Sequence, residues 1–407
     1  MKTKLWEKEL KTDNIIEKFT VGKDKELDMF IAAFDVMASK AHAKMLCKVN
    51  LITKSELDQL LEGLGEIEQL LKEGKFKIED GVEDIHSQIE FYLTNKFGET
   101  GKKIHTARSR NDQVLTAIKL YLKHELNIIK QKSQKLQSIF TDLSLKHKDN
   151  LLPGYTHFQI AMPSSFGMWL GAYAESIEDD LELLDAAYKI CDKNPMGSGA
   201  GYGTSFHIDR EFTTTEMGFS KLNKSAVYAQ MTRGKSEKVT AMALSPIAHT
   251  LSKFSYDVCL YLCQNFAFIS FPDTLTTGSS IMPHKKNPDV FELIRAKCNV
   301  IQGLPNQLTL LTNNLPSGYH RDMQLTKELI FPAIEQFKEC LDVLIYVLPQ
   351  MEINNHCIED EKYKYMFSVD EVNKLVASGI PFRDAYQLIG KQIQEGNFKA
   401  DKKAIRS

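Results

Sequence analysis

The strongest constraint on the fold of this chain is an apolar stripe with helical spacing that runs from Asn111 to about Lys148. Its apolar residues recur every three or four positions over about ten turns, and Pro153-Gly154 follows as a stop signal. An average globular helix has only about a dozen residues. Because one compact globule cannot cover so long a helix on every side, the stripe predicts a bundle of long helices that other subunits complete.

Four later stretches have the same spacing and predict four more long helices. These stretches cover about residues 164–184, 234–264, 289–301 and 326–348. Pro246 predicts a kink in the second of them, and shorter helices are expected at about 370–377 and 381–395. We find no convincing alternation of apolar and polar residues of the kind that strands show. The sequence therefore predicts an all-α fold with five long central helices.

The chain is expected to form more than one domain, because 407 residues are too many for one compact core. The helical patterns change near residues 110 and 355. We therefore expect an N-terminal helical domain at residues 1–110, a central five-helix bundle at 111–355, and a small, apparently shortened C-terminal helical domain at 356–407.

Composition excludes several classes of protein. The formal net charge of −2 lacks the clustered basic surplus of a nucleic-acid-binding surface. No apolar stretch reaches about 18 residues, and the first residues hold no apolar signal region, so we expect neither a membrane span nor secretion. The seven cysteines are odd in number and include no Cys-x-x-Cys pair. This pattern favours a reduced, cytoplasmic protein.

Neither a metal nor a nucleotide cofactor is expected. The histidines lie far apart, without His-x-x-x-His spacing or a matching pair of carboxylates. Gly197 to Gly203 repeats glycine, but it lacks the strand–helix frame of a dinucleotide site.

The most informative polar segment is Thr277-Gly-Ser-Ser-Ile-Met-Pro-His-Lys-Lys-Asn-Pro-Asp289. A flexible loop that enters a helix at Pro288 offers free N–H groups and a positive dipole end to an anion, and Lys285 adds a full charge. Such a loop is suited to closing over a carboxylate. On composition alone a plain surface turn is about equally favoured.

A second polar segment, His105-Thr-Ala-Arg-Ser-Arg-Asn-Asp-Gln113, stands at the head of the longest stripe. Two arginines disfavour a helix N-terminus. The conflict favours an anionic ligand, or an acid from another subunit, over a simple ion-paired cap.

Two further segments, Gly154-Tyr-Thr-His-Phe-Gln159 and Tyr319-His-Arg-Asp-Met-Gln-Leu-Thr-Lys-Glu328, also lie at the ends of long helical patterns. Taken alone, a lone histidine is usually packed or solvated, and a polar helix start is usually just solvated. Four polar clusters at helix ends are nevertheless typical of a site assembled across a bundle.

These segments resemble the fumarase/aspartase superfamily, whose members share the Gly-Ser-Ser-x-Met-Pro-x-Lys-x-Asn-Pro loop. Thr106-Ala-Arg-Ser-Arg-Asn-Asp-Gln-Val114 is similar to the argininosuccinate lyase branch, and so are Gly154-Tyr-Thr-His157, Glu83-Asp-Ile-His86 and Tyr319-x-Arg-Asp-x-Gln-x-x-Lys327. The resemblance covers about residues 19–396. It implies a homotetramer with shared active sites that splits argininosuccinate into arginine and fumarate by β-elimination, without metal or cofactor.

The resemblance also implies roles for single residues. His157 corresponds to the general acid and Ser279 to the general base, while Glu292 orients the histidine of a neighbouring subunit. Lys285 and Asn287 hold the carboxylate on which negative charge develops. The implied substrate contacts are Asn111, Thr156, Tyr319, Gln324 and Lys327, with Ser109 and Arg110 lining the same pocket.

Some positions depart from the family pattern. Phe19-Thr-Val-Gly22 lacks the serine expected near the substrate, His284 replaces the commoner glutamine, and Leu5-Trp-Glu-Lys8 differs from the usual start. Two alternatives stay open. One is another fumarate-releasing lyase of the adenylosuccinate lyase or aspartase type, and the other is a non-catalytic structural homologue like some delta-crystallins.

Overall fold

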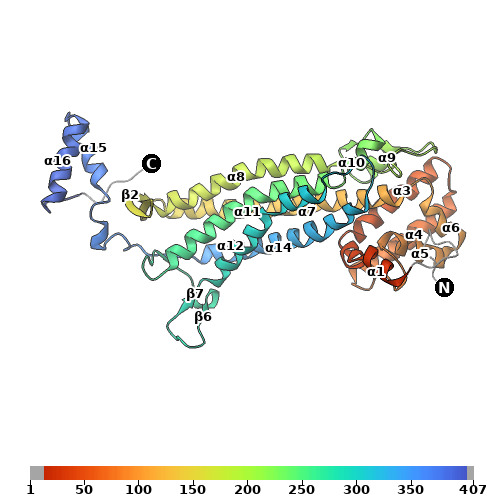
Figure 1. Ribbon diagram of the computed structural model, residues 1–407, viewed down its shortest axis with the longest axis horizontal. Helices are drawn as coiled ribbons and strands as arrows, with labels where there is room; N and C mark the ends of the chain where they lie inside the picture. The colour runs from red at the N-terminus through yellow and green to blue at the C-terminus, as the bar shows by residue number, and fades with distance from the viewer. Residues whose placement is uncertain (1–12, 401–407) are drawn as a thin grey trace. The chain divides into compact units, whose positions relative to one another are not determined.

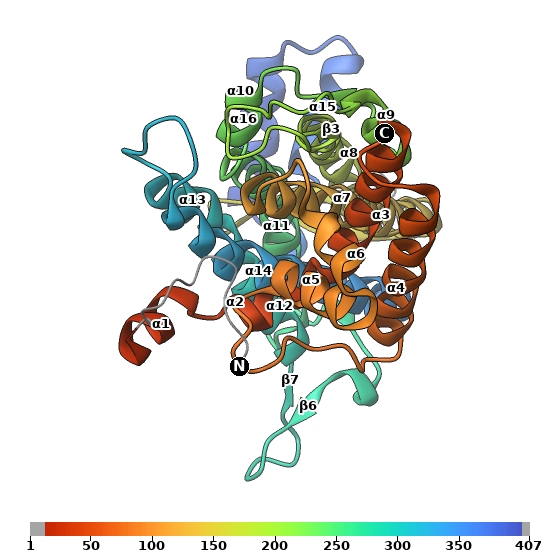
Figure 2. The same ribbon diagram turned by 90° about the vertical axis from the view of Figure 1, so that its right-hand side faces the viewer.

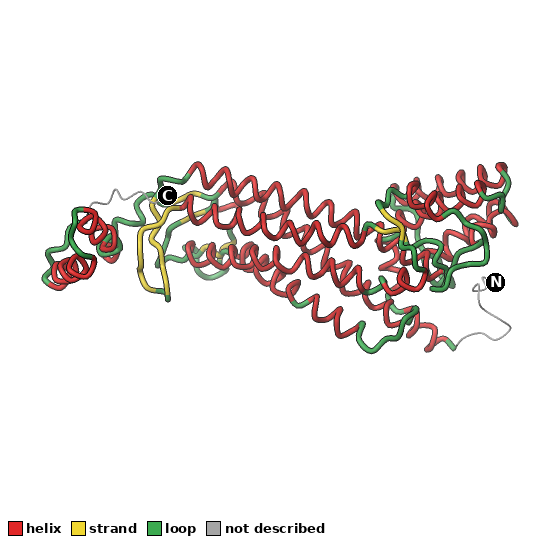
Figure 3. The backbone as a smooth tube through the Cα atoms, turned by 90° about the horizontal axis from the view of Figure 1, so that it is seen from above, coloured by secondary structure: helices red, strands yellow, loops and turns green. Residues whose placement is uncertain are grey.

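The computed structural model of the protein describes residues 13–400, so the start at Leu5–Lys8 lies outside the described residues. Helices dominate the described chain (Figure 3), as the all-α prediction required. The contacts divide the chain into two compact units. The first contains the described residues up to Lys130 with Glu182–Pro246 and Val300–Phe337, and the second contains Gln131–Leu181, Ile247–Asn299 and the described residues from Lys338. This division follows contacts, so the three sequence domains stay a prediction.

The five long helical patterns all form helices (Figure 1). They are α7 (Arg110–Lys146), α8 (Phe166–Cys191), α11 (Lys235–Leu262), α12 (Asp289–Gln302) and α14 (Thr326–Val347). Helix α12 is the shortest of the five, because it ends just before Gly303. Helix α13 (Leu304–Leu311) follows it, with Pro305 in its first turn. Proline lacks an N–H and is tolerated at a helix start, so a new helix begins here.

The first unit also contains the helices of the N-terminal part of the chain and three short helices from later segments (Figure 2). These are α1 (Asn14–Val21), α2 (Asp24–Leu27), η1 (Asp28–Phe30), α3 (Ala32–Lys48), α4 (Lys54–Lys72), α5 (Ile85–Phe97), α6 (Glu99–Lys102), η2 (Lys103–His105), α9 (Arg210–Glu216), α10 (Ala226–Met231) and η4 (Arg321–Leu325). Helix α3 packs against α4, and α4 against α5. Strands β3 (Lys193–Asn194) and β4 (Lys221–Leu222) form one short parallel pair.

The second unit contains an antiparallel hairpin that the sequence analysis did not predict. Strand β1 (Leu151–Thr156) pairs with β2 (Gln159–Ser165), with an irregular register between Pro153 and Tyr155. The two prolines of the hairpin, Pro153 and Pro163, interrupt the alternation that identifies strands, and its turn lacks the usual asparagine and glycine. The expectation of no strands is therefore wrong here.

The remaining elements of the second unit are short. They are β5 (Ile269–Ser270) paired with β8 (Glu352–Ile353), β6 (Thr277–Gly278) paired with β7 (Lys286–Asn287), η3 (Asp273–Leu275), η5 (Leu348–Gln350), η6 (Glu361–Tyr363), α15 (Ser368–Ala377) and α16 (Phe382–Gln394). The two C-terminal helices match the expected positions and pack on each other through Val372, Ala385 and Ile389.

The Gly-rich segment after α8 surrounds a buried carboxylate. Backbone N–H groups of Gly197 and Gly199 donate to Asp112 Oδ2 at 3.0 and 2.9 Å, and both glycines have positive φ angles of 84° and 58°. Glycine adopts such angles without steric cost. The glycines therefore hold the start of α7, through Asp112, in place.

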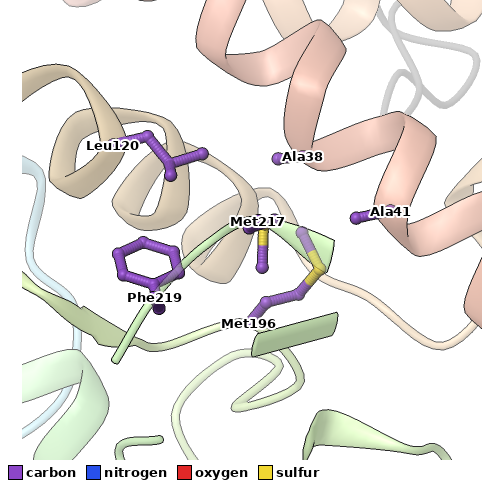
Figure 4. Close-up of a cluster of buried hydrophobic side chains, with 6 residues drawn as sticks. All are labelled: Ala38, Ala41, Leu120, Met196, Met217 and Phe219. Atoms are coloured by element: carbon purple, nitrogen blue, oxygen red, sulfur yellow. The ribbon is translucent and has the colours of Figure 1, made fainter. Parts of the chain in front are cut away.

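A buried apolar cluster in the first unit joins α3 and α7 to the segment that follows α8 (Figure 4). Its members are Ala38, Ala41, Leu120, Met196, Met217 and Phe219. The two alanines of α3 are small enough for the larger side chains to fill the space beside that helix. Leu120, which is 4% exposed, is the contribution of α7.

Leu120→Ala is expected to lower the free energy of unfolding by about 2–5 kcal/mol, because it removes buried methyl groups and leaves a cavity. The matched control is Leu145→Ala on the same helix, where the leucine is 66% exposed and the expected change is under about 0.5 kcal/mol. Denaturant unfolding of the two variants beside the wild type measures the difference. Equal destabilisation would contradict the importance of this cluster.

Candidate active site

A small cavity of about 110 Å³ in the first unit collects charged and polar side chains. Its lining includes the predicted residues Arg110, Asn111, Tyr319, Gln324 and Lys327. The other lining residues are Asp24, Asp28, Glu83, Asp84, His86, Val114, Arg233 and Arg321. Residues from distant parts of the sequence thus converge at one place.

Arg110, at the start of α7, is held by two acids from the segment that leads into α5. Its Nη2 lies 3.2 Å from Glu83 Oε2, and its Nε lies 2.8 Å from Asp84 Oδ2. Burial opposes ionisation of Asp84, but the charges of His86 and Arg110 outweigh it and lower the Asp84 pKa. The acids that compensate Arg110 therefore come from the same chain, and an anionic ligand at this helix start stays a prediction.

Lys327 is 3% exposed and lies between two carboxylates. Its Nζ is 2.5 Å from Asp24 Oδ1 and 2.6 Å from Asp28 Oδ1. Burial alone would lower the Lys327 pKa, but Asp28 and Asp24 raise it. The ammonium group is therefore charged and held in a fixed place.

The neighbouring side chains of η4 hold the C-terminal end of α1. Gln324 Nε2 donates to the carbonyl oxygens of Thr20 and Val21 at 3.0 and 3.1 Å. Arg321 Nη2 donates to Thr20 O and to Glu83 Oε1, both at 3.0 Å. The polar run that opens α14 thus forms one wall of the cavity.

A buried ion pair supports another wall. His86 Nδ1 lies 2.8 Å from Asp35 Oδ2, and Gln113 Nε2 donates to Asp35 Oδ1 at 2.9 Å. Burial lowers the His86 pKa, but the Asp35 carboxylate more than compensates, so the pKa is raised overall. Asp35 lies on α3, His86 on α5 and Gln113 on α7, so these contacts join the three helices.

In the second unit, Thr156 and His157 stand at the tip of the β1–β2 hairpin. Thr156 pairs with Gln159, so His157 and Phe158 form a two-residue turn, and their φ angles are +53° and +57°. Positive φ at two successive positions matches a type I′ turn, and for side chains other than glycine it costs about 1–2 kcal/mol per residue. The turn exposes the His157 imidazole.

Ser279 and Lys285 lie on the loop between β6 and β7, and Asn287 is the last residue of β7, just before α12 (Figure 1). Ser279 Oγ accepts hydrogen bonds from the backbone N–H groups of Ile281 and Met282, at 3.4 and 3.2 Å. Asn287 Nδ2 lies 3.5 Å from Gly278 O. Lys285 and Glu292 are exposed.

The predicted site residues therefore form three groups within one chain. The first is the cavity wall, which Ser109 adjoins by accepting a hydrogen bond from Asn111 N at 3.3 Å. The second is the hairpin tip, and the third is the loop with Glu292. Within the described part of the second unit, no hydrogen bond joins His157 to Ser279.

Sequence reasoning missed Asp24, Asp28 and Arg233, and it assigned no role to Glu83, Asp84, His86 or Arg321. The i,i+4 spacing of Asp24 and Asp28 was the available signal, because it places two carboxylates on one side of a helical turn.

Among residues 13–400, no three or more His, Cys, Asp or Glu side chains form a group that could hold a metal ion. None of the helices in these residues has the length and hydrophobicity of a membrane span. None of the seven cysteines forms a disulfide.

Solved structures with the same fold include two enzymes. An EDDS lyase variant with bound fumarate superposes with a TM-score of 0.80 at 20% identity, covering 93% of this chain and 76% of that one. A class II fumarase from Schistosoma mansoni gives a TM-score of 0.77 at 15% identity, covering 93% and 88%. The protein thus has the fold of the fumarase/aspartase superfamily.

Sequence comparison is more specific. A family model described as a lyase matches residues 6–303. The argininosuccinate lyase of Phocaeicola vulgatus is 52% identical over 99% of this chain and 90% of its own length. The argininosuccinate lyase of Thermotoga neapolitana is 42% identical over 96% and 98%. Similarity of this degree over nearly the whole length shows that the chain is a lyase and belongs to the argininosuccinate lyase family.

Proposed function

We propose that the protein catalyses the reversible β-elimination of argininosuccinate to L-arginine and fumarate, as a step of arginine biosynthesis. The observation that carries this proposal is the 52% identity to an argininosuccinate lyase over 99% of the chain. In the reaction a base removes a proton from the carbon next to a succinyl carboxylate, and the bond from the neighbouring carbon to the guanidinium nitrogen breaks. An acid returns a proton to that nitrogen.

Ser279 is the proposed base. A free serine hydroxyl is a poor base, so its alkoxide needs stabilisation. The N–H groups of Ile281 and Met282 already point at Ser279 Oγ, and Lys285 lies on the same loop. Donors fixed in advance around a developing negative charge are each worth about 10²–10³-fold in rate.

Lys285 and Asn287 are proposed to bind the substrate carboxylate next to the acidic carbon. Removal of that proton gives an aci-carboxylate with two negative charges, which an ammonium group and an amide N–H stabilise. Lys285 lies on the Ser279 loop and Asn287 on the strand that follows it, so loop closure would bring base and charge stabilisation to the substrate together.

His157 is the proposed acid, with Glu292 of a neighbouring subunit orienting its imidazole. A strained turn that presents an exposed histidine supports this role, because backbone strain concentrates at functional sites. Exposed apolar side chains support a homotetramer, since Tyr256, Leu293 and Val300 are 47%, 61% and 66% exposed in the single chain. The free thiols favour the cytoplasm.

The cavity of the first unit is proposed to bind the rest of the substrate. Its proposed contacts are Ser109, Arg110, Asn111, Tyr319, Gln324 and Lys327. Thr156, at the tip of the hairpin, is a further proposed substrate contact. Lys327 and Arg110 are already paired with acids. They therefore act on the substrate as charges that are held in fixed positions and are already partly compensated.

Purified protein should release fumarate from argininosuccinate, and not from adenylosuccinate or aspartate. Ultraviolet absorbance of fumarate measures this release, and size-exclusion chromatography with light scattering measures the subunit number. Release from one of the other two substrates would favour another lyase of the superfamily. No release from any of them would favour a non-catalytic homologue.

Ser279→Ala is expected to lower kcat by about 10²–10⁴-fold, because it removes the group that accepts the proton. Ser280→Ala, one position along the same loop, is the matched control and should keep most of the activity. Circular dichroism and light scattering should show both variants folded and assembled. Similar kcat values for the two variants would refute the assignment of the base.

Coexpression of Ser279→Ala with His157→Gln should restore part of the activity that each variant lacks alone. If acid and base come from different chains, mixed tetramers contain some sites with both groups intact. Differently tagged chains allow the mixed tetramers to be isolated before the fumarate assay. A mixed tetramer as inactive as either parent would show that one chain supplies both residues.

A further inference from the structure

The lining of the first-unit cavity carries charges of both signs. Four carboxylates contribute to it, namely Asp24, Asp28, Glu83 and Asp84, and so do the cations Arg110, Arg233, Arg321 and Lys327. His86 and Arg233 are paired with Asp35 and Glu237, which lie outside the lining. A site for a dicarboxylate alone would need a surplus of cations, which this lining lacks. It therefore suits a ligand that carries both signs.

The carboxylates around Lys327 exceed the cations close to them. Asp24 and Asp28 share the single Lys327 ammonium group, at 2.5 and 2.6 Å. The nearby Arg233 is already paired with the buried Glu237, at 3.0 Å between Nε and Oε1. One negative charge at this end of the cavity is therefore left for a cation of the ligand.

We propose that Asp24 is a specificity-determining residue, which binds, together with Asp28, the α-ammonium group at the amino-acid end of argininosuccinate. This inference rests on the proposed function. The arginine end of that substrate is a zwitterion, whereas the succinyl end is a dicarboxylate. The excess negative charge at Asp24 and Asp28 fits only the first, and Asn111 and Tyr319 on the same lining can donate to its carboxylate.

A purely structural role is the alternative, since the Asp24–Lys327 pair also ties α2 to α14. The chain contains a second tie between the same segments, Lys23 Nζ to Glu328 Oε2 at 3.6 Å. Neither Lys23 nor Glu328 lines the cavity. Glu328→Gln is therefore a matched control that removes a tie without touching the binding site.

The protonation of Asp24 gives an independent readout. Burial raises the Asp24 pKa to about 6; the charge of Lys327 opposes this shift, that of Asp28 adds to it, and that of Arg233 opposes it. As pH falls through 6, Asp24 gains a proton and loses the charge that holds the ammonium group. In the wild type, kcat/KM for arginine in the reverse reaction should fall below pH 6, since this ratio reports the free enzyme. Asp24→Asn should lose that step of the pH profile.

The decisive experiment is the reverse reaction, because arginine and fumarate are then separate substrates. Asp24→Asn should raise KM for arginine about tenfold, the usual effect of losing a charge-assisted hydrogen bond. KM for fumarate should stay unchanged, and kcat should change by less than about twofold. Glu328→Gln should leave both KM values unchanged, and it should lower the thermal midpoint only slightly, because the Lys23–Glu328 pair lies at the surface.

An arginine analogue tests the same contact in the wild-type tetramer, in case Asp24→Asn does not fold. Calorimetry should show that 5-guanidinopentanoate, which lacks the α-ammonium group, binds about tenfold more weakly than arginine. Equal binding of the two ligands would overturn the proposal. So would a rise in KM for fumarate in Asp24→Asn, or identical behaviour of Asp24→Asn and Glu328→Gln. Failure of the wild type to act on argininosuccinate would instead refute the proposed function.

Discussion

Charged groups cannot be buried without partners, and this constraint positions the helix ends of the first unit. Arg110 at the start of α7 meets Glu83 and Asp84 at the approach to α5, and Lys327 in the first turn of α14 meets Asp28 on η1. Removing one partner of such a buried pair costs about 3–5 kcal/mol. Exposed pairs such as Lys54–Asp58 contribute at most about 1 kcal/mol. The few buried pairs, rather than the many surface ones, therefore fix the geometry of the cavity.

The long helices could be predicted from the sequence, whereas the hairpin could not. Helix α7 begins and ends within two residues of its predicted bounds, because its stripe repeats over many turns. The β1–β2 hairpin was missed because two prolines interrupt its alternation and its turn consists of His157 and Phe158. A short element offers few positions from which to recognise a period, so local exceptions hide it.

The charged pairs were unpredictable for a different reason. Lys327 and Asp28 are 299 positions apart in the chain, and no local pattern indicates that they meet. Sequence reasoning recognised the conflict of two arginines at a helix start but placed the compensating acid on a ligand or another subunit. Glu83 and Asp84 supply it instead. The type of partner can be inferred from one segment, whereas its source depends on the tertiary fold.

The two kinds of proposed site residue also differ in how they are held, and this difference suits their roles. The charged cavity residues Lys327 and Arg110 are held by ion pairs, so they can bind the unreactive end of a substrate with little reorganisation. Ser279 and Lys285 lie on a loop, and His157 lies on a hairpin tip, where movement costs less. Binding energy from a remote, unchanged part of a substrate can offset the cost of ordering mobile groups at the reacting bond. A rigid pocket for the amino-acid end would thus allow the catalytic loop to stay open until a substrate is bound.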